Sequence, residues 1–261
     1  MSVAAHCGGG PNGAAMGPDG ALYVCNNGGN QYSAEHFIAT GPAPDYAHGS
    51  IQRVDLDTGA VTTLYTACQG QWLSSPNDLV FDAHGGFYFT DMGKKHARNR
   101  DHGGIYYALA DGSHINEVAY QVQVANGIGL SPDGQTLYVA ETDTSRLWAF
   151  DITEPGRVRK QGFPSPHGGR LVCGLPGFQR LDSLAVDAAG NICVATLMTG
   201  HITVIAPSGE VVRKVKMPDS YVTNICFGGA DLRTAYITLA EKGQLASMPW
   251  PEAGHPLHFS A

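Results

Sequence analysis

The sequence is poor in charged residues, and the charge that it does carry is not basic. Charged residues make up 15% of the 261 residues, well below the roughly 25% of an average soluble domain. There are 16 Lys and Arg against 23 Asp and Glu, which gives a formal net charge of −7. Proteins that bind nucleic acid carry a basic patch or stripe, so this balance argues against a nucleic-acid partner.

Long apolar runs and paired cysteines are also missing. No apolar stretch approaches the ~18 residues that a membrane span needs, so no membrane partner is expected. Residues 1–10 lack the basic start and apolar core of a secretory signal. The six cysteines include no Cys-x-x-Cys pair, which disfavours both a zinc knuckle and a disulfide scaffold. We therefore expect a cytoplasmic protein with reduced thiols.

The common motifs of phosphate, zinc and serine chemistry do not occur. There is no P-loop, no His-Glu-x-x-His and no Gly-x-Ser-x-Gly. Residues Gly8–Gly13 have the glycine spacing of a dinucleotide site, but a predicted hairpin follows instead of the helix that would hold pyrophosphate. The eleven histidines show no ligand spacing and are interpreted as surface residues. The basic run 94–100 is interpreted as a solvated loop, because Asp101 follows it directly.

Glycine and proline are abundant, and a repeated pattern fills the chain. The 34 Gly and 15 Pro leave little room for long helices. Residues 12–25 and 126–140 each read as an Asn, a short apolar stretch, Pro-Asp-Gly and a second apolar strand, with the same spacing from the Asn to the Pro-Asp-Gly. Weaker copies begin at Asn77, Asp182 and Thr223.

Each copy predicts a strand, a tight turn and a second strand, and most copies are followed by a further strand pair. Four strands per unit, repeated along the chain, predict the blades of a β-propeller. A β-sandwich of two Greek keys is the competing all-β interpretation, but it does not predict a repeated turn sequence. We therefore expect an all-β chain in which residues 1–261 form a single β-propeller domain. The segments Asn30–His48 and Gly162–Gly177 are expected to be loops over one face.

The residue that opens each repeat is polar and carries oxygen, and it directly precedes an apolar strand. In a propeller the first strand of every blade lines the central channel, so these residues are expected to converge there. The five residues are Asn12, Asn77, Asn126, Asp182 and Thr223. Carboxylate and amide oxygens around a narrow axis suit a hard cation such as Ca²⁺. The alternative is that these residues make only local Asx-turns or cap strand ends.

Several segments closely resemble the SMP-30/gluconolactonase/LRE family of regucalcin-like, six-bladed propeller lactonases. The matching segments are Ser75–Leu79, Phe89–Asp91, Asn126–Gly134, Asp182–Asp187 and Thr223–Gly229. The resemblance spans essentially the whole chain and implies a propeller of the six-bladed type with one catalytic divalent metal. By motif, the family's metal ligands fall on Asn77, Asn126 and Asp182. Known family activities include hydrolysis of sugar lactones and, in relatives, of phosphotriesters.

The sequence departs from the family pattern in two places. The family's first-blade Glu lies in a Pro-Glu-Gly-type segment that is absent here, and five repeat openings are found instead of six. Residues Ser2–His6 read like the last strand of an incomplete first blade, so we expect a shortened start whose exposed edge is covered by a second copy, or a less stable monomer. Several family members carry an Arg that touches the sugar where this chain has Ser75, which argues against an aldonolactone substrate.

The resemblance and the residue types together predict a metal-dependent hydrolase of a lactone or related cyclic ester. The metal, Ca²⁺ or else Mn²⁺, Zn²⁺ or Fe²⁺, would act as a Lewis acid, and Asp182 would be the catalytic residue that activates water. Asp91, Glu141 and Asn12 are the candidate substrate-binding residues, although Asp91 and Glu141 could equally be solvated loop carboxylates. The alternatives are a non-catalytic calcium-binding propeller and a phosphotriesterase-like hydrolase.

Overall fold

The computed structural model describes residues 3–33 and 38–260, and these residues form β-strands and connections without a helix. They fall into two compact units. The first unit contains the residues up to Ala125, together with Pro155–Arg157 and the segment from Leu257. The second unit contains Asn126–Glu154 and Val158–Pro256. Within the described ranges there is accordingly no helix that could cross a membrane.

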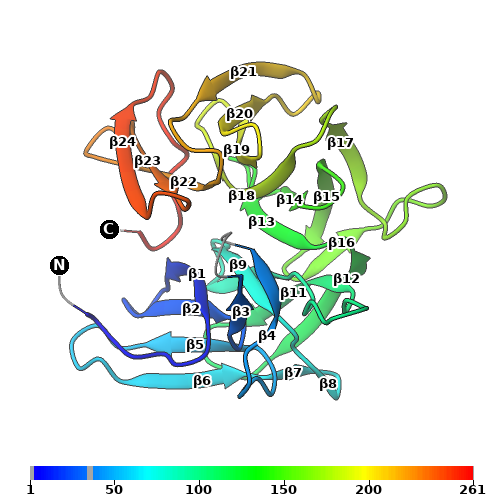
Figure 1. Cartoon of the computed structure of the whole chain (residues 1–261), viewed down its shortest axis with the longest axis vertical. Helices are drawn as coiled ribbons and strands as arrows, with labels where there is room; N and C mark the ends of the chain where they lie inside the picture. Colours follow the sequence, from blue (N-terminus) through cyan, green and yellow to red (C-terminus); the bar gives the residue numbers. More distant parts are fainter. Residues whose placement is uncertain (1–2, 34–37, 261) are drawn as a thin grey trace. The chain divides into compact units, whose positions relative to one another are not determined.

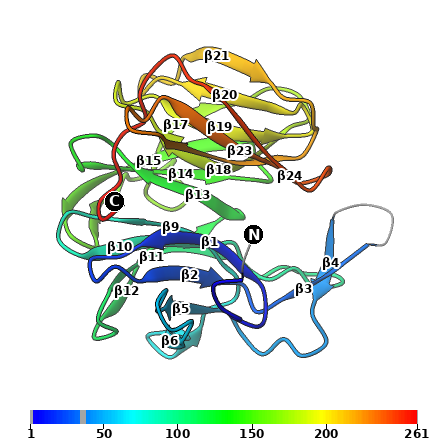
Figure 2. The same ribbon diagram turned by 90° about the vertical axis from the view of Figure 1, so that its left-hand side faces the viewer.

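The first unit holds two four-stranded antiparallel sheets (Figure 1). The first sheet has the order β1 (Pro11–Met16), β2 (Leu22–Asn26), β5 (Ser50–Val54), β6 (Val61–Tyr65). The second has the order β12 (Ile115–Val122), β11 (Gly103–Leu109), β10 (Gly86–Asp91), β9 (Pro76–Phe81). Two small hairpins lie in the connections: β3 (Asn30–Tyr32) with β4 (Ala39–Pro42), and β7 (Ala67–Cys68) with β8 (Gln71–Trp72). Strands β3 and β4 extend away from the first sheet (Figure 2).

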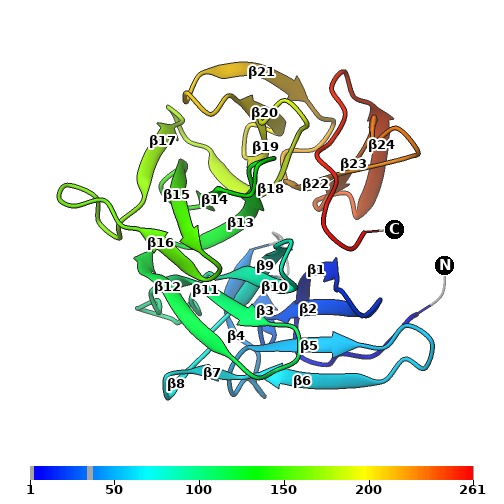
Figure 3. The same ribbon diagram turned by 180° about the vertical axis from the view of Figure 1, so that it is seen from behind.

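The second unit holds three antiparallel sheets (Figure 3). One has the order β13 (Ala125–Leu130), β14 (Thr136–Glu141), β15 (Arg146–Glu154), β16 (Arg157–Arg159), and β17 (Arg170–Gly174) also pairs with β15. The next has the order β18 (Arg180–Val186), β19 (Ile192–Leu197), β20 (His201–Ile205), β21 (Val211–Lys216). The last has only β22 (Val222–Gly228), β23 (Thr234–Leu239) and β24 (Gln244–Pro249).

Strand β19 explains why the sheet β18–β21 is packed on both of its faces. Side chains alternate between the two faces of a strand, so a strand that is buried on both faces reads as a continuous apolar run. In β19, Ile192 and Val194 pack into the cluster that contains Leu147 and Leu184, whereas Cys193 and Ala195 pack into the cluster that contains Ile225. The sheet β18–β21 is therefore covered on both faces within the second unit, as a blade of a β-propeller is.

In the first unit the two sheets meet over an aromatic core. Phe87 and Phe89 of β10 are fully buried and share one cluster with Tyr23 of β2 and Ile51 of β5. The ring of Tyr23 lies edge-on to Phe81 with the centroids 5.1 Å apart. Because aromatic pairs in this arrangement contribute beyond their buried area, this core fixes the two sheets against each other.

The β-propeller pattern and the repeat-opening hairpins are confirmed, but the predicted number of blades is wrong. The described residues form five such sheets and not six, and residues 3–10 form no strand. The expected strand at Ser2–His6 is therefore absent over its described part, and Ser2 lies outside the described residues. The two segments predicted to be loops also contain strands, because β3 and β4 lie in the first segment and β17 lies in the second.

Candidate functional site

Four of the five residues that open the repeats lie where the pairing of the first strand to the second is interrupted. Between the pairs Pro11–Asn26 and Ala14–Val24, two residues of β1 lie opposite one residue of β2. The same extra residue occurs in β9, β18 and β22, so that Asn12, Asn77, Asp182 and Thr223 all lie in these interruptions. A β-bulge of this kind re-aims side chains and releases backbone groups from the ladder, and bulges are frequent beside active sites.

In the second unit, two of the predicted metal ligands lie on backbone segments that touch. A Cβ added to Gly127 would come within 2.7 Å of the Asp182 carbonyl oxygen and of the Leu184 nitrogen. Only a glycine permits this approach of β13 to the bulge of β18. Asn126, the residue before Gly127, is 4% exposed, and its Nδ2 donates to the Thr142 Oγ1 at 3.0 Å. The strand that contains Asn126 thus touches the bulge that contains the half-buried Asp182.

The first unit repeats this arrangement with Asn12 and Asn77. A Cβ on Gly13 would lie 2.5 Å from the Asn77 carbonyl oxygen and 2.7 Å from the Asp78 Cα. Asn12 is exposed, whereas Asn77 is buried and its Nδ2 lies 3.3 Å from the Met92 Sδ. The three predicted ligands are therefore divided, with Asn77 in the first unit and Asn126 and Asp182 in the second.

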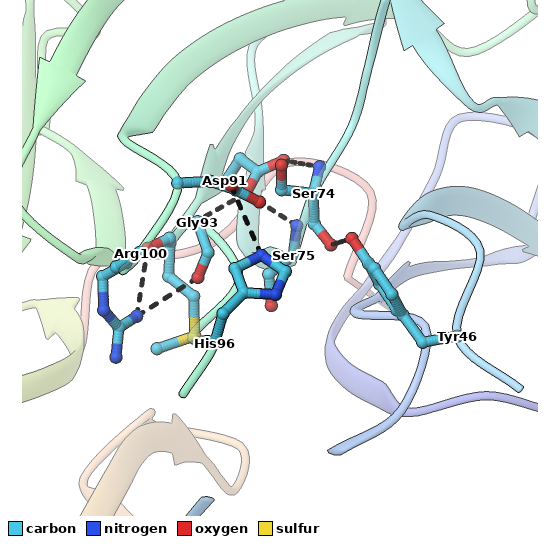
Figure 4. Close-up of polar contacts among 9 residues, drawn as sticks. Tyr46, Ser74, Ser75, Asp91, Gly93, His96 and Arg100 are labelled. Atoms are coloured by element: carbon cyan, nitrogen blue, oxygen red, sulfur yellow. Dashed lines mark hydrogen bonds and ion pairs between the residues drawn. The ribbon is translucent and has the colours of Figure 1, made fainter. Parts of the chain in front are cut away.

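Asp91, a predicted substrate-binding residue, lies at the end of β10 and is only 3% exposed. Its carboxylate accepts three backbone N–H groups, from Ser74 at 2.7 Å, Ser75 at 2.7 Å and Gly93 at 2.9 Å (Figure 4). Burial raises the pKa of Asp91 to about 6, and the three N–H donors oppose this rise because they favour the anion. The carboxylate thus fixes the segment that leads into β9 and Asn77.

Asn26 at the end of β2 makes contacts like those of Asp91. Its Oδ1 accepts the N–H of Gly10, just before β1, and the N–H of Gly28, two residues further on, both at 2.9 Å. Asp91 likewise binds Ser75, just before β9, and Gly93, two residues further on. The end of the second strand is therefore a position at which an oxygen-bearing side chain ties together the two ends of a hairpin.

Glu141, the other predicted substrate-binding carboxylate, occupies the same place at the end of β14 and is 1% exposed. Its Oε2 accepts the Thr144 hydroxyl at 2.7 Å, and its Oε1 lies 3.5 Å from the His167 Nε2. Like Asp91, it is buried, so the alternative that these two carboxylates are solvated loop residues is wrong.

The interpretation of the sequence missed two buried polar residues. The His167 side chain is fully buried and lies edge-on to Trp148, with the ring centroids 4.5 Å apart, so its expected surface position is wrong. Lys94, placed in a solvated loop, is 1% exposed. The partners of both residues are distant in sequence, so no local sequence pattern predicts their burial.

The donors available for a metal ion are oxygens. Within the described residues, no three His, Cys, Asp or Glu side chains are grouped so that they could hold a metal ion. The Asn126 amide, the Asp182 carboxylate and the backbone oxygens at the bulge are hard donors, which suit Ca²⁺ better than a soft metal. Asn126 and Asp182 lie on the neighbouring strands β13 and β18, so in the chemistry of their donors these residues suit such a cation.

Comparison with known proteins gives consistent matches along the chain. Residues 3–241 match the SMP-30/Gluconolactonase/LRE-like region family. A protein named lactonase drp35 from Staphylococcus saprophyticus is 32% identical over 200 residues, which cover 77% of this chain and 54% of the relative. A gluconolactonase from Zymomonas mobilis is 26% identical over 233 residues, which cover 84% of this chain and 58% of the relative. The chain thus spans little more than half the length of these curated relatives.

Among solved structures, a gluconolactonase from Xanthomonas campestris is similar to this chain over most of its length. It is described as important in glucose secondary metabolic pathways. The two proteins are 26% identical with a TM-score of 0.69, and the alignment covers 92% of this chain and 72% of the other.

Proposed function

We propose that this chain, which belongs to the SMP-30/Gluconolactonase/LRE-like family, hydrolyses lactones or related cyclic esters with the help of a divalent cation. The observation that carries the proposal is the contact of the Gly127 backbone with the bulge at Asp182, which brings an amide and a carboxylate onto neighbouring strands. The names of the relatives, lactonase and gluconolactonase, support the substrate class.

Asn126 and Asp182 would hold the cation, and Ca²⁺ suits their oxygens best. A divalent cation bound there supplies Lewis-acid polarisation of the ester carbonyl. Asp182 has a second task, because its carboxylate can accept a proton from the attacking water. The water oxygen then bonds to the carbonyl carbon, the ring C–O bond breaks, and the proton passes to the alkoxide that leaves the ring. The product is an open-chain hydroxy acid.

Hydrolysis of a panel of γ- and δ-lactones, followed by acid release at constant pH, tests this proposal. We expect activity that is lost on chelation, restored by Ca²⁺ and abolished in Asp182→Asn. The matched control is Asp231→Asn, because Asp231 is an exposed aspartate of the same unit whose carboxylate accepts the Arg233 N–H in a turn. The Asn77→Ala variant tests the third residue of the predicted ligand set.

Four outcomes would overturn the proposal or parts of it. An undiminished rate after chelation would reject the cation, and full activity in Asp182→Asn would reject the role of that carboxylate. Cation binding without turnover of any lactone would instead support a non-catalytic calcium-binding protein. Turnover of phosphotriesters but not of lactones would support the phosphotriesterase-like alternative.

A further inference from the structure

The ammonium group of Lys94 is enclosed in a cage of oxygens and one aromatic ring. Its Nζ donates to the Asn27 carbonyl at 2.6 Å, the Gly29 carbonyl at 2.9 Å and the Asn30 Oδ1 at 2.9 Å. The ring of Tyr46 lies 4.4 Å from the same nitrogen, within the range of a cation–π interaction. Burial lowers the pKa of Lys94 to about 8, so the group still carries its charge at neutral pH. This is the arrangement of a bound cation, with a side chain supplying the ion.

Tyr46 connects this cage to Asp91. Its hydroxyl donates to the Ser74 carbonyl at 2.8 Å, while the Asp91 carboxylate accepts the N–H of the same serine (Figure 4). Ser74 is thus bound on both sides, by Tyr46 on its carbonyl and by Asp91 on its nitrogen. Lys94 follows Asp91 by three residues. The short segment that starts at the end of β10 therefore binds the connection after β2 through Lys94 and the connection before β9 through Asp91.

The cage lies at the blade edge that carries the repeat openings of the first unit. Pro11 pairs with Asn26, which places the start of β1 beside the end of β2. Pro76 pairs with Asp91, which places the start of β9 beside the end of β10. The caged residue Asn27 also donates its N–H to the Gly10 carbonyl at 2.8 Å. Lys94 therefore acts at the edge where the chain enters β1 and β9.

We propose that Lys94 is a positioning residue whose ammonium, as a built-in cation, fixes the backbone of Asn27–Asn30 as a preformed wall at the edge where the chain enters β1 and β9. The effect of Lys94 on turnover rests on the proposed lactone hydrolysis. The cage does not depend on that proposal, because it recognises a primary alkylammonium group by three acceptors and one ring face. Because the wall is already ordered, this segment loses no conformational freedom when substrate binds. KM is therefore lower, while the rate of the chemical step is unchanged.

Chemical rescue separates the charge from the bulk of the side chain. Lys94→Ala removes three methylene groups and the ammonium, and propylammonium ion supplies the same atoms; propanol is the neutral control. We expect Lys94→Ala to lose amide hydrogen-exchange protection at Gly29 and Ala43, whose N–H groups are bonded within this connection. Propylammonium is expected to restore that protection and the melting temperature, and propanol is not.

Lys95→Ala is the matched control, because Lys95 is exposed and its ammonium donates to the Ala39 carbonyl and not to the cage. It is expected to leave the protection at Gly29 unchanged. If Lys94→Ala does not fold, Lys94→Met keeps the volume of the side chain and removes the charge, and it is expected to show the same loss of protection. The proposed role of the ammonium in the cage would be overturned if a folded Lys94 variant kept full hydrogen-exchange protection. Equal rescue by propanol and propylammonium would also overturn it.

Kinetics distinguishes positioning from general support of the fold. For a lactone that wild type hydrolyses, we expect Lys94→Ala to raise KM by about tenfold with kcat unchanged, and propylammonium to reverse the change. A fall in kcat with KM unchanged would overturn the positioning role. If wild type hydrolyses no lactone, the proposed function fails, while exchange and melting still decide on the cage.

Discussion

Replacing Gly127 by alanine is expected to force the first strands β13 and β18 apart. The added Cβ would meet the Asp182 oxygen, the Ser183 Cα and the Leu184 nitrogen, each at 2.7 Å. All three are backbone atoms, so no side chain can rotate away to relieve the contact. Overpacking in a well-packed region costs about 1–3 kcal/mol, and for a protein of this size each kcal/mol lowers Tm by roughly 2–4 °C.

The assay for this prediction combines thermal melting with calcium titration. Gly127→Ala should melt several degrees below wild type and bind Ca²⁺ more weakly, because Asn126 and Asp182 are separated when the strands move. The control is Gly162→Ala in the same unit, since a Cβ at Gly162 meets nothing within 4 Å. If Gly127→Ala melts like wild type and binds Ca²⁺ equally well, the close approach is not needed for the site, and the reasoning is refuted.

Three further predictions concern the first unit. Because burial raises the Asp91 pKa from 3.8 to about 6, the protonated group stabilises the fold fully below pH 3.8, and this stabilisation is lost as the pH rises through about 6. The change in the free energy of unfolding across this window amounts to up to about 3 kcal/mol. Asp91→Asn should remove this pH dependence from denaturation curves recorded between these pH values. If the free energy of unfolding of Asp91→Asn depended on pH as that of wild type does, the raised pKa of Asp91 would be contradicted. Phe89→Ala should lower the free energy of unfolding by about 3–5 kcal/mol in urea denaturation, whereas Phe178→Ala, at an exposed ring, should lower it by less than about 0.5 kcal/mol. Equal losses would contradict the placement of Phe89 in the core. Gly13→Ala should lower Tm as Gly127→Ala does, since its Cβ would lie 2.5 Å from the Asn77 oxygen, and an unchanged Tm would refute this.

The repeated hairpins could be predicted because their signals are local. A turn residue between two apolar runs specifies the strands on either side, as in Asn77–Asp82 followed by Phe87–Thr90. The observed strands β9 and β10 differ from these ranges by one residue at each end. The expectation of a further blade was less secure, because it depended on a family pattern and on the segment Ser2–His6, whose described residues do not form a strand.

The contacts made by buried polar side chains could not be predicted in this way. The sequence run that contains Lys94 looks solvated, and the three acceptors of its ammonium belong to residues more than sixty positions earlier in the chain. Asp91 and Glu141 are the last residues of β10 and β14, but two of the backbone groups that hold Asp91 come from the connection before β9. The bulges likewise depend on the register between strands, which the residue types alone do not specify.

Calorimetric titration of Ca²⁺ into the chelator-stripped protein tests the central claim most directly, with Asp182→Asn and Asp231→Asn measured alongside. The account predicts saturable binding at or below roughly 10⁻⁴ M for wild type and Asp231→Asn, and none for Asp182→Asn. Absence of binding by wild type, or equal binding by Asp182→Asn, would contradict it.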